Sequence, residues 1–271
     1  MRTDAFLKAA LALAGLALPL AGVVAGSPNA DEIVHQANLA SYYAGEDGRS
    51  EARMRIFDAQ GREQRRQFTV LRRNVEKGGD QQFLVVFSQP SDVRGTTFLV
   101  HKHVHGEDDR WLFLPGLDLV KRIAAGDKRT SFVGSHYYYE DVSGRRPDED
   151  LHELIEANEE HYVLKHTPKD PSSVEFADYT TWIDRQTFLP MKIEYRGAGG
   201  QAIRRVEVLK VEEIGGHPTV TASRISDLQG GGHTELQFRY IAYDIGMPED
   251  LFGERSLRYP PAQWLSRPEV D

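Results

Sequence analysis

The sequence predicts a mainly β protein, built as a single antiparallel half-barrel with a helix near its start and short extra helices. Between residues 53 and 243, runs of alternating apolar and polar side chains follow one another, separated by polar or glycine-rich turns such as residues 197–200. Only one long stretch, residues 31–43, has helical spacing instead. Repeated strand–turn–strand spacing is typical of a meander that closes, or nearly closes, on itself.

The helix expected at residues 31–43 has both a start and a stop signal. Asp31 can cap it, and apolar residues beginning with Ile33 and Val34 recur at nearly helical spacing. A turn of glycine and acidic residues at 45–48 ends the pattern. Shorter helices are expected at residues 138–142 and 248–252.

The strands are expected between these helices. They lie at residues 53–57, 64–73, 82–87, 96–104, 110–114, 151–157, 162–166, 176–184, 189–195, 203–211, 219–225 and 234–243. The run at 82–87 is continuously apolar, which predicts a strand covered on both faces. No linker rich in proline, glycine or serine divides the chain, so residues 31–265 are expected to form one domain, followed by a tail at 266–271.

Charge and cysteine usage exclude several classes of function. The net charge of −8 argues against nucleic acid or an anionic membrane surface as the main partner. The chain has no cysteine, which excludes disulfides, thiolate catalysis and cysteine-ligated metal. The absence of cysteine also excludes a lipid-modified cysteine at the N-terminus.

The first 30 residues have the pattern of a secretory signal peptide. Arg2 and Lys8 provide the positive start, and residues 9–24 form an apolar run too short for a membrane span. Cleavage after Ala25 or after Ala30 fits the small residues there, and an uncleaved anchor is the alternative. We therefore expect a protein exported to the periplasm.

Two groups of residues suggest chemistry. His101, His103 and His105 alternate, so on a strand they would share one face at spacings of about 7 Å, and either a zinc site or a solvent-facing polar stripe would fit. Ser135 and His136, with Asp141 nearby, suggest a hydrolase, but the nucleophile-elbow motif is missing. The polar stripe and a non-catalytic serine are the favoured interpretations, and we expect no metal and no organic cofactor.

A set of short motifs resembles the bacterial family of outer-membrane lipoprotein-sorting proteins. The motifs are Arg94-Gly95-Thr96, Trp111-x-Phe113-x-Pro115, Lys121-Arg122-Ile123, Ser131-Phe132-x-Gly134-Ser135 and Tyr139-Glu140-Asp141, with further similarity at Trp182-x-Asp184, Pro190-x-Lys192 and Phe252. The resemblance implies the fold of the periplasmic lipoprotein carrier, an open β-barrel with a helical lid over an acyl-chain site. Residues 31–43 would supply the lid.

The resemblance also implies a function and partners. The protein would bind a lipid, or the acyl chains of a lipoprotein, and shuttle it between envelope membranes. An inner-membrane lipid-exporting transporter of the resistance-nodulation-division type would load or unload it. The expected cavity-lining residues are Phe98, Val100, Trp111, Phe113 and Trp182. The alternatives are an envelope scaffold or accessory subunit of an export pump that holds no lipid, and a periplasmic hydrolase.

Overall fold

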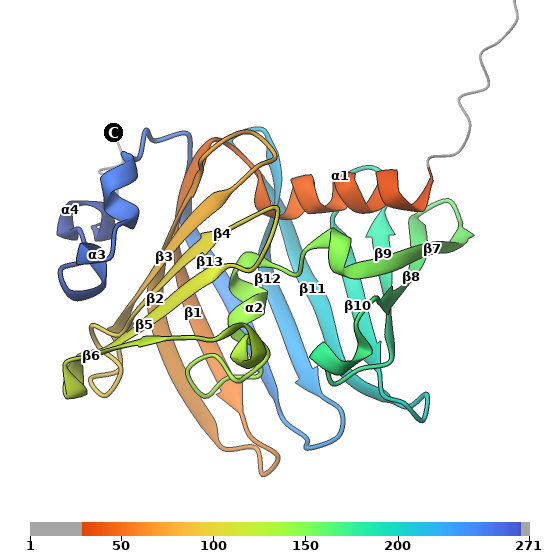
Figure 1. Cartoon of the computed structure of the whole chain (residues 1–271), viewed down its shortest axis with the longest axis horizontal. Coiled ribbons are helices and arrows are strands. Elements are labelled where there is room, and N and C mark those ends of the chain that lie inside the picture. The colour runs from red at the N-terminus through yellow and green to blue at the C-terminus, as the bar shows by residue number, and fades with distance from the viewer. Residues whose placement is uncertain (1–28, 267–271) are drawn as a thin grey trace, which may run out of the picture.

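The structure, a computed structural model, describes residues 29–266 and contains one 13-stranded antiparallel sheet (Figure 1). The strand order is β6-β5-β4-β3-β2-β1-β13-β12-β11-β10-β9-β8-β7. Every neighbouring pair is also consecutive in the chain except β1 and β13. The sheet curls but does not close, so β6 and β7 are its two edges and the predicted half-barrel is confirmed. The expected signal peptide lies almost wholly outside the described residues.

The elements follow in chain order. The strands are β1 (Asp47–Phe57), β2 (Glu63–Asn74), β3 (Gln81–Gln89), β4 (Thr97–Lys102), β5 (Asp109–Leu114), β6 (Leu119–Arg122), β7 (Asp150–Ala157), β8 (His161–Pro168), β9 (Asp178–Asp184), β10 (Pro190–Arg196), β11 (Ala202–Ile214), β12 (His217–Asp227) and β13 (His233–Tyr243). The α-helices are α1 (Ala30–Tyr42), α2 (Tyr139–Ser143), α3 (Arg255–Arg258) and α4 (Ala262–Leu265). The 3₁₀ turns are η1 (Pro115–Leu117), η2 (Ala125–Asp127), η3 (Pro147–Glu149), η4 (Pro171–Ser173) and η5 (Glu249–Phe252).

Most expected elements are present, with differences among the short ones: neither α3 nor α4 was predicted. The short strand β6 was not predicted, because its basic residues do not alternate with apolar ones over enough positions. The helix expected at residues 248–252 is the 3₁₀ turn η5 rather than an α-helix. The hairpin β4–β5 and the pair β7–β8 form as predicted.

The sheet has a concave and a convex apolar face. Along β3, Phe83, Val85 and Phe87 point to the concave side, while Leu84 and Val86 point to the convex side. Alternate side chains of a strand point to opposite faces, so a strand buried on both sides must be apolar at successive positions. The prediction that this run is covered on both faces is confirmed.

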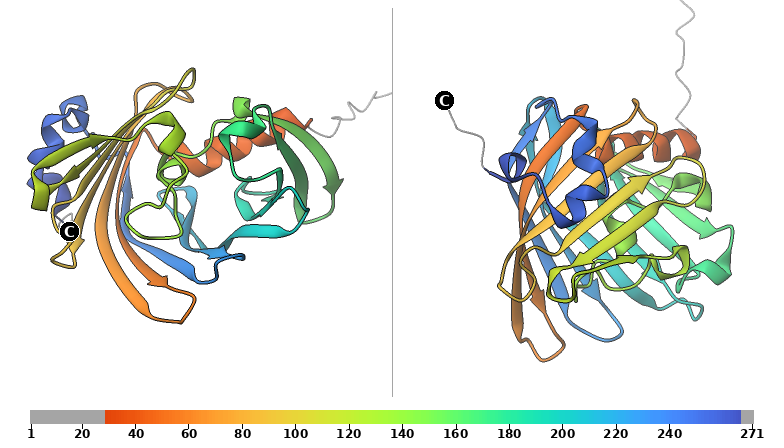
Figure 2. Two further views of the ribbon diagram at one scale, coloured as in Figure 1. Left: turned by 60° about the horizontal axis from the view of Figure 1, so that its bottom comes forward. Right: turned by 60° about the vertical axis from the view of Figure 1, so that its left-hand side comes forward.

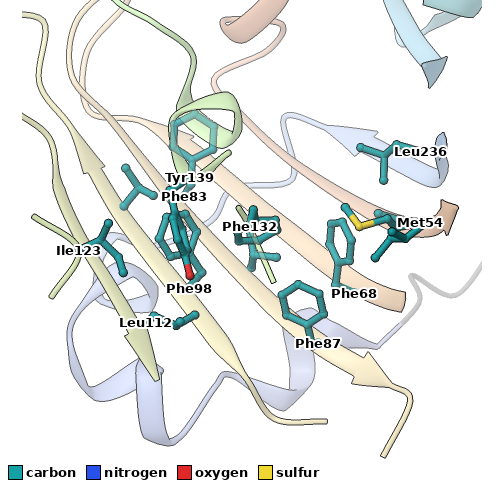
Figure 3. Close-up of a cluster of buried hydrophobic side chains, with 14 residues drawn as sticks. Met54, Phe68, Phe83, Phe87, Phe98, Leu112, Ile123, Phe132, Tyr139 and Leu236 are labelled. Carbon is teal, nitrogen blue, oxygen red and sulfur yellow. The ribbon is translucent and has the colours of Figure 1, made fainter. Parts of the chain in front are cut away.

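The chain between the two edge strands covers the concave face. Residues 123–149, which we call the crossing segment, join β6 to β7 and lie inside the curve of the sheet (Figure 2). Phe132 is the centre of their contact with the sheet (Figure 3). Its ring centroid lies 5.7 Å from that of Phe87, 5.4 Å from Phe98 and 5.6 Å from Tyr139.

The chain after β13 covers the convex face. Phe252, which is fully buried, packs with Leu251 and Leu257 against Leu71, Leu84 and other residues of β2–β5. This places η5, α3 and α4 outside the curve, at one end of the sheet (Figure 1). Each face of the β2–β5 region is thus closed by a segment from elsewhere in the chain.

Helix α1 lies over the other half of the sheet, where Ile33, Val34 and Ala37 pack against side chains of β8 and β9. Its N-cap is Asn29, whose side chain accepts a hydrogen bond from the backbone of Glu32 at 2.8 Å. The expectation that Asp31 caps the helix is therefore wrong, because the helix begins one residue earlier and Asp31 lies in its first turn.

The C-terminal end of α1 is tied to the sheet by polar side chains. Gln81 Nε2 donates to the carbonyl of Tyr42 at 2.7 Å, and Asn74 Nδ2 donates to that of Gly45 at 3.0 Å. The Arg72 guanidinium donates to the carbonyls of Ala44 and Gly45. The last carbonyls of a helix have no partner within it, so these bonds satisfy groups that would otherwise be unpaired.

A histidine pair joins the edge strand β7 to β8. His152 Nδ1 lies 2.8 Å from His166 Nδ1, and the outer nitrogens contact the Pro147 carbonyl and the Thr181 hydroxyl, each at 2.8 Å. A carbonyl only accepts, so His152 Nε2 carries a proton and its Nδ1 accepts from His166. His166 Nε2 then accepts from Thr181. Burial, with His152 beside it, lowers the pKa of His166 to about 3.

We expect Phe252→Ala to lower the free energy of unfolding by about 3–5 kcal/mol, because the ring leaves a cavity in a closed apolar cluster. Urea unfolding of native and variant protein measures this. Tyr259→Ala is the control, since that ring is 71% exposed and its loss should change stability by no more than about 0.5 kcal/mol. Equal effects of the two substitutions would contradict the packing described here.

His166 should make stability depend on acidity. Its pKa is lower in the folded chain than in the unfolded chain, so between about pH 6.5 and pH 3 the unfolded chain binds the extra proton. From pH 7 to pH 4 the native protein should lose roughly 3 kcal/mol more unfolding free energy than His166→Gln does. Urea unfolding of both proteins across this range is the measurement, and parallel pH curves would contradict the assignment.

Candidate functional site

A cavity of about 370 Å³, partly open to solvent, lies between the C-terminal part of α1 and the concave face. Its walls come from β1, β2, β3, β10, β12 and β13 and from the crossing segment. We call it the first chamber. Most of the side chains around it are apolar: Met54, Phe68, Val70, Phe83, Val85, Phe132, Val142, Leu189, Ile193, Val220, Leu236, Phe238 and Ile241. Its size and lining are typical of a site for a small apolar ligand.

A second chamber of about 280 Å³ adjoins the first, beneath the middle of α1. The two share eight lining residues: Ser41, Tyr42, Tyr137, Asp141, Pro190, Ile193, Val220 and Ser223. Tyr42 and Tyr137 therefore stand at the boundary. The Tyr137 hydroxyl lies 2.8 Å from Ser223 Oγ, and burial raises the pKa of Tyr137 far above its usual range.

The position of Tyr42 depends on close packing against the crossing segment. A side chain at Gly144, which has φ +79°, would meet the Tyr42 ring at 2.4 Å, so only glycine fits there. Lys102 Nζ lies 4.7 Å from the centre of the same ring and donates to the Ser143 carbonyl at 2.6 Å. Burial lowers the pKa of Lys102 to about 8. These contacts join the end of α1 to the crossing segment.

One wall of the second chamber is polar and charged. Glu140 is buried and forms ion pairs with Arg129, with Lys128 at 3.3 Å and with Arg145 at 3.5 Å. Burial alone would raise the pKa of Glu140, but the three cations outweigh it and hold that pKa below its usual value. Arg145 also bonds Asp150 in bidentate fashion, at 2.8 and 2.9 Å.

The other polar lining residues of this chamber include Asp141, Arg146 and both histidines of the pair. Asp141 pairs with Arg204 and accepts a hydrogen bond from the Tyr138 backbone at 2.6 Å. The apolar part of the lining includes Ile183, Ile193, Val206, Val208 and Ile225. The second chamber thus combines charged and apolar lining.

None of the five predicted cavity-lining residues lines either chamber. Phe98 and Val100 do face the concave side, but both residues are fully buried in the core. The rings of Phe132 and Tyr139 cover Phe98. Trp111 and Phe113 belong to the convex cluster under η5 and α3.

The error lies in the phase of β5. In the β4–β5 ladder Phe98 pairs with Leu112, whereas Leu99 pairs with Trp111, so Leu112 shares the concave face with Phe98. Directly paired residues lie on the same face of a sheet, and a shift of one residue exchanges the faces. Trp182 likewise points away from its neighbours Thr181 and Ile183, and Lys192 Nζ covers its ring at 4.1 Å.

Most of the family-motif residues shape the backbone, and four of them reach the chambers. Phe132, Asp141 and Pro190 line the first chamber, and Glu140, Asp141 and Pro190 line the second. Val133 and Gly134, at φ +50° and +75°, form a tight turn that the Ser135 backbone closes with a 3.0 Å bond to the Phe132 carbonyl. This turn directs the Phe132 side chain into the sheet.

Gly95, Thr96, Pro115 and Arg122 lie near β3–β6. Gly95 has φ +80° and packs close to Pro115, its amide donating to the Phe87 carbonyl at 2.8 Å. Thr96 is buried, and its carbonyl accepts from the Phe87 amide at 2.9 Å. Arg122 pairs with Asp109 on the surface. These residues hold the connections between strands and do not border the chambers.

The histidines of the β4 region do not converge. The strand ends at Lys102, so only His101 lies on it, with its Nε2 2.7 Å from the Phe252 carbonyl. His103 contacts Asp80 at 2.8 Å and Asp109 at 3.4 Å. Across residues 29–266, no group of three or more metal-binding side chains is placed to hold an ion.

The serine and histidine of the crossing segment also have other partners. The Ser135 hydroxyl donates to the Phe132 carbonyl at 2.7 Å, inside the turn. His136 Nδ1 lies 2.8 Å from the Thr234 hydroxyl. The two side chains stabilise the turn and its contact with β13.

The residues that do line the chambers could not be selected from the alternating pattern alone. They come from strands that are adjacent only because β1 pairs with β13, with Met54 opposite Leu236. The polar wall comes from charged side chains that a sequence pattern would place on the surface. The motif residues Phe132, Glu140, Asp141 and Pro190 were the sequence signal that pointed to the cavity.

Comparisons with known proteins agree with this architecture. A family model described as an uncharacterized protein matches residues 79–259. No curated protein matches the chain. Among the described helices, none has the length and apolar character needed to cross a membrane.

Solved structures give the most specific similarity. An outer membrane lipoprotein-sorting protein domain of Vibrio parahaemolyticus is 27% identical, with a TM-score of 0.76 over 84% of this chain and 98% of that one. A DUF1329 family protein of Desulfovibrio piger is 27% identical, with a TM-score of 0.75 over 83% and 95%. A LolA superfamily protein of Nitrosomonas europaea, 19% identical with a TM-score of 0.65 over 84% and 99%, shares the fold. The chain therefore belongs to the family that the model over residues 79–259 describes, and its structure is similar to those of a lipoprotein-sorting domain and a DUF1329 family protein.

Proposed function

We propose that this protein is a periplasmic carrier that binds a lipid, or the acyl chains of a lipoprotein, in the first chamber beneath α1. The observation that carries the proposal is the apolar chamber itself, which is bounded by six strands, the crossing segment and the helix. The similarity to the Vibrio lipoprotein-sorting domain supports the same class of cargo.

The energetics favour an acyl or other hydrocarbon chain as cargo. Each methylene group moved from water into an apolar site contributes about 0.8 kcal/mol. A chain that exposes several such groups in water therefore gains enough to offset the cost of fixing it in place. Nothing in this binding step needs a metal or an organic cofactor.

The way α1 is attached supports a role as a lid. Its C-terminal end is tied by Arg72, Asn74 and Gln81, while its N-terminal half is held by the packing of a few apolar side chains. Such an element can open at its N-terminal half without breaking the sheet, because the polar ties lie at the other end. Loading and release would take place through this opening.

The cellular setting remains part of the proposal. The signal-like residues 1–30 support export to the periplasm. A carrier needs a donor and an acceptor membrane, and an inner-membrane lipid-exporting transporter of the resistance-nodulation-division type is the proposed partner. We do not propose an enzymatic role, because the Ser135 and His136 side chains form hydrogen bonds that stabilise their turn and its contact with β13.

Binding of a fluorescent palmitate analogue to delipidated protein tests the carrier function. Ile193→Trp should weaken binding at least about tenfold, because Ile193 borders both chambers and a larger ring there fills space that the chain needs. Fluorescence titration of native and variant protein measures the effect.

The matched control is Leu209→Trp, which adds the same ring at a position that is 50% exposed and borders neither chamber. It should bind the probe as the native protein does. If folded native protein takes up no long-chain probe, the carrier proposal fails and the scaffold interpretation gains support. If Ile193→Trp binds normally, the chain occupies a different site.

A further inference from the structure

Two tyrosine side chains lie where the chambers adjoin, and they bear on the length of the cargo. This inference rests on the proposed carrier function. Tyr42 and Tyr137 both belong to the lining of both chambers. Tyr42 is the last residue of α1, whereas Tyr137 belongs to the crossing segment. The two rings therefore come to the boundary from the lid and from the segment inside the curve of the sheet.

Tyr137 joins the crossing segment to the sheet. Its hydroxyl lies 2.8 Å from Ser223 Oγ on β12. Its backbone is held as well, because its carbonyl accepts from the Phe132 amide at 2.7 Å and its amide donates to Ser135 Oγ at 3.1 Å. The side chain is thus fixed at both ends, and its ring spans the space between the crossing segment and β12.

Tyr42 joins α1 to the crossing segment. A Cβ atom at Gly144 would lie 2.6 Å from the Tyr42 hydroxyl oxygen, so the outer end of the ring packs directly against the backbone there. The Tyr42 carbonyl accepts from Gln81 at 2.7 Å, which anchors the other end of the residue to β3. Lys102 Nζ lies 4.7 Å from the ring centre. Burial raises the pKa of Tyr42 well above its usual range, as expected for an enclosed ring.

Together the two rings form a partition across the inside of the half-barrel. It runs from α1 through the Tyr42 ring to Gly144, and from the crossing segment through the Tyr137 ring to Ser223 on β12. The first chamber lies on one side of it and the second chamber on the other. At about 370 Å³, the first chamber is near the lower end of the range for ligand sites, roughly 300–1,000 Å³.

A chamber of fixed size limits how much of a hydrocarbon chain it can bury. Each methylene group that enters an apolar site adds to the affinity, whereas one that stays in water adds nothing. The first chamber is partly open to solvent, so a chain that has reached the partition leaves its remaining length in water. Affinity should therefore rise with chain length up to a limit and then level off.

We infer that Tyr42, with Tyr137, sets this limit and is the residue that determines which chain lengths the carrier distinguishes. The preferred cargo is an amphiphile with one acyl chain whose buried part ends at the partition. Removing the Tyr42 ring opens the first chamber towards the apolar residues of the second, which include Ile183 and Val206. A longer chain then becomes fully buried.

A series of alkanoates tests the inference by titration calorimetry on delipidated protein, each ligand being kept below its micelle concentration. The series is octanoate, decanoate, dodecanoate, tetradecanoate and hexadecanoate. Native protein should gain roughly fourfold in affinity for each methylene up to the limit and little beyond it. Tyr42→Ala should move the limit to longer chains. Hexadecanoate should then bind at least about tenfold more tightly than to native protein, with no such gain for octanoate.

Tyr43→Ala is the matched control, because it removes the same ring from the next residue, which borders neither chamber. The Tyr43 hydroxyl donates instead to the Gly79 carbonyl at 2.7 Å. This variant should keep the native limit. Tyr42→Leu, which keeps an apolar side chain under the lid but lacks the ring, is the second variant if Tyr42→Ala does not fold. A gain confined to long chains cannot come from misfolding, which would weaken binding of every chain.

The other outcomes separate this inference from the carrier function. If native affinity rises steadily through hexadecanoate, no partition limits the chain and the inference is overturned. If native protein has a limit that neither substitution of Tyr42 moves, the role assigned to Tyr42 is wrong. Both results leave the carrier function intact. If folded native protein binds none of the alkanoates, the carrier function itself fails.

Discussion

The structure depends on one topological constraint: its two edge strands, β6 and β7, are consecutive in the chain but lie at opposite ends of the sheet. The segment that joins them must cross the opening of the half-barrel. It crosses on the concave side, where Phe132 and Tyr139 fill the core over β3–β5. The same segment supplies Tyr137, Asp141 and Arg145 to the chambers. Core, cavity walls and charged network thus all follow from a single crossing.

The charged network gives the crossing segment its position rather than a large net stability. Buried ion pairs lose hydration, and their attraction only partly repays that loss. Arg129, Arg145 and Arg204 nevertheless reach acidic partners from different elements, which allows few alternative arrangements of residues 128–150. A carrier needs such a fixed wall beside a movable one. Helix α1, tied by polar groups at one end and by a few apolar side chains at the other, has the features of the movable wall.

The β2–β5 region of the sheet is covered on both faces. Phe252 and its neighbours cover the convex face, and Phe132 packs on the concave face. These strands are therefore buried on both faces and form the rigid half. The first chamber lies between α1, the crossing segment and strands β1–β3, β10, β12 and β13. Part of its lining, including Met54, Phe68 and Phe132, belongs to the apolar cluster of the concave face.

The sequence by itself determined the class of fold, the helix near its start and most strands, because period-two alternation, helical spacing and turn residues act between near neighbours in the chain. The tertiary structure alone decided which residues border the cavity. Trp111 and Phe113 lie on the convex face because the register with β4 sets their phase, and a shift of one residue would exchange the faces. The β1–β13 pairing, the His152–His166 contact and the buried Arg145 join polar or distant residues whose positions no local pattern specifies.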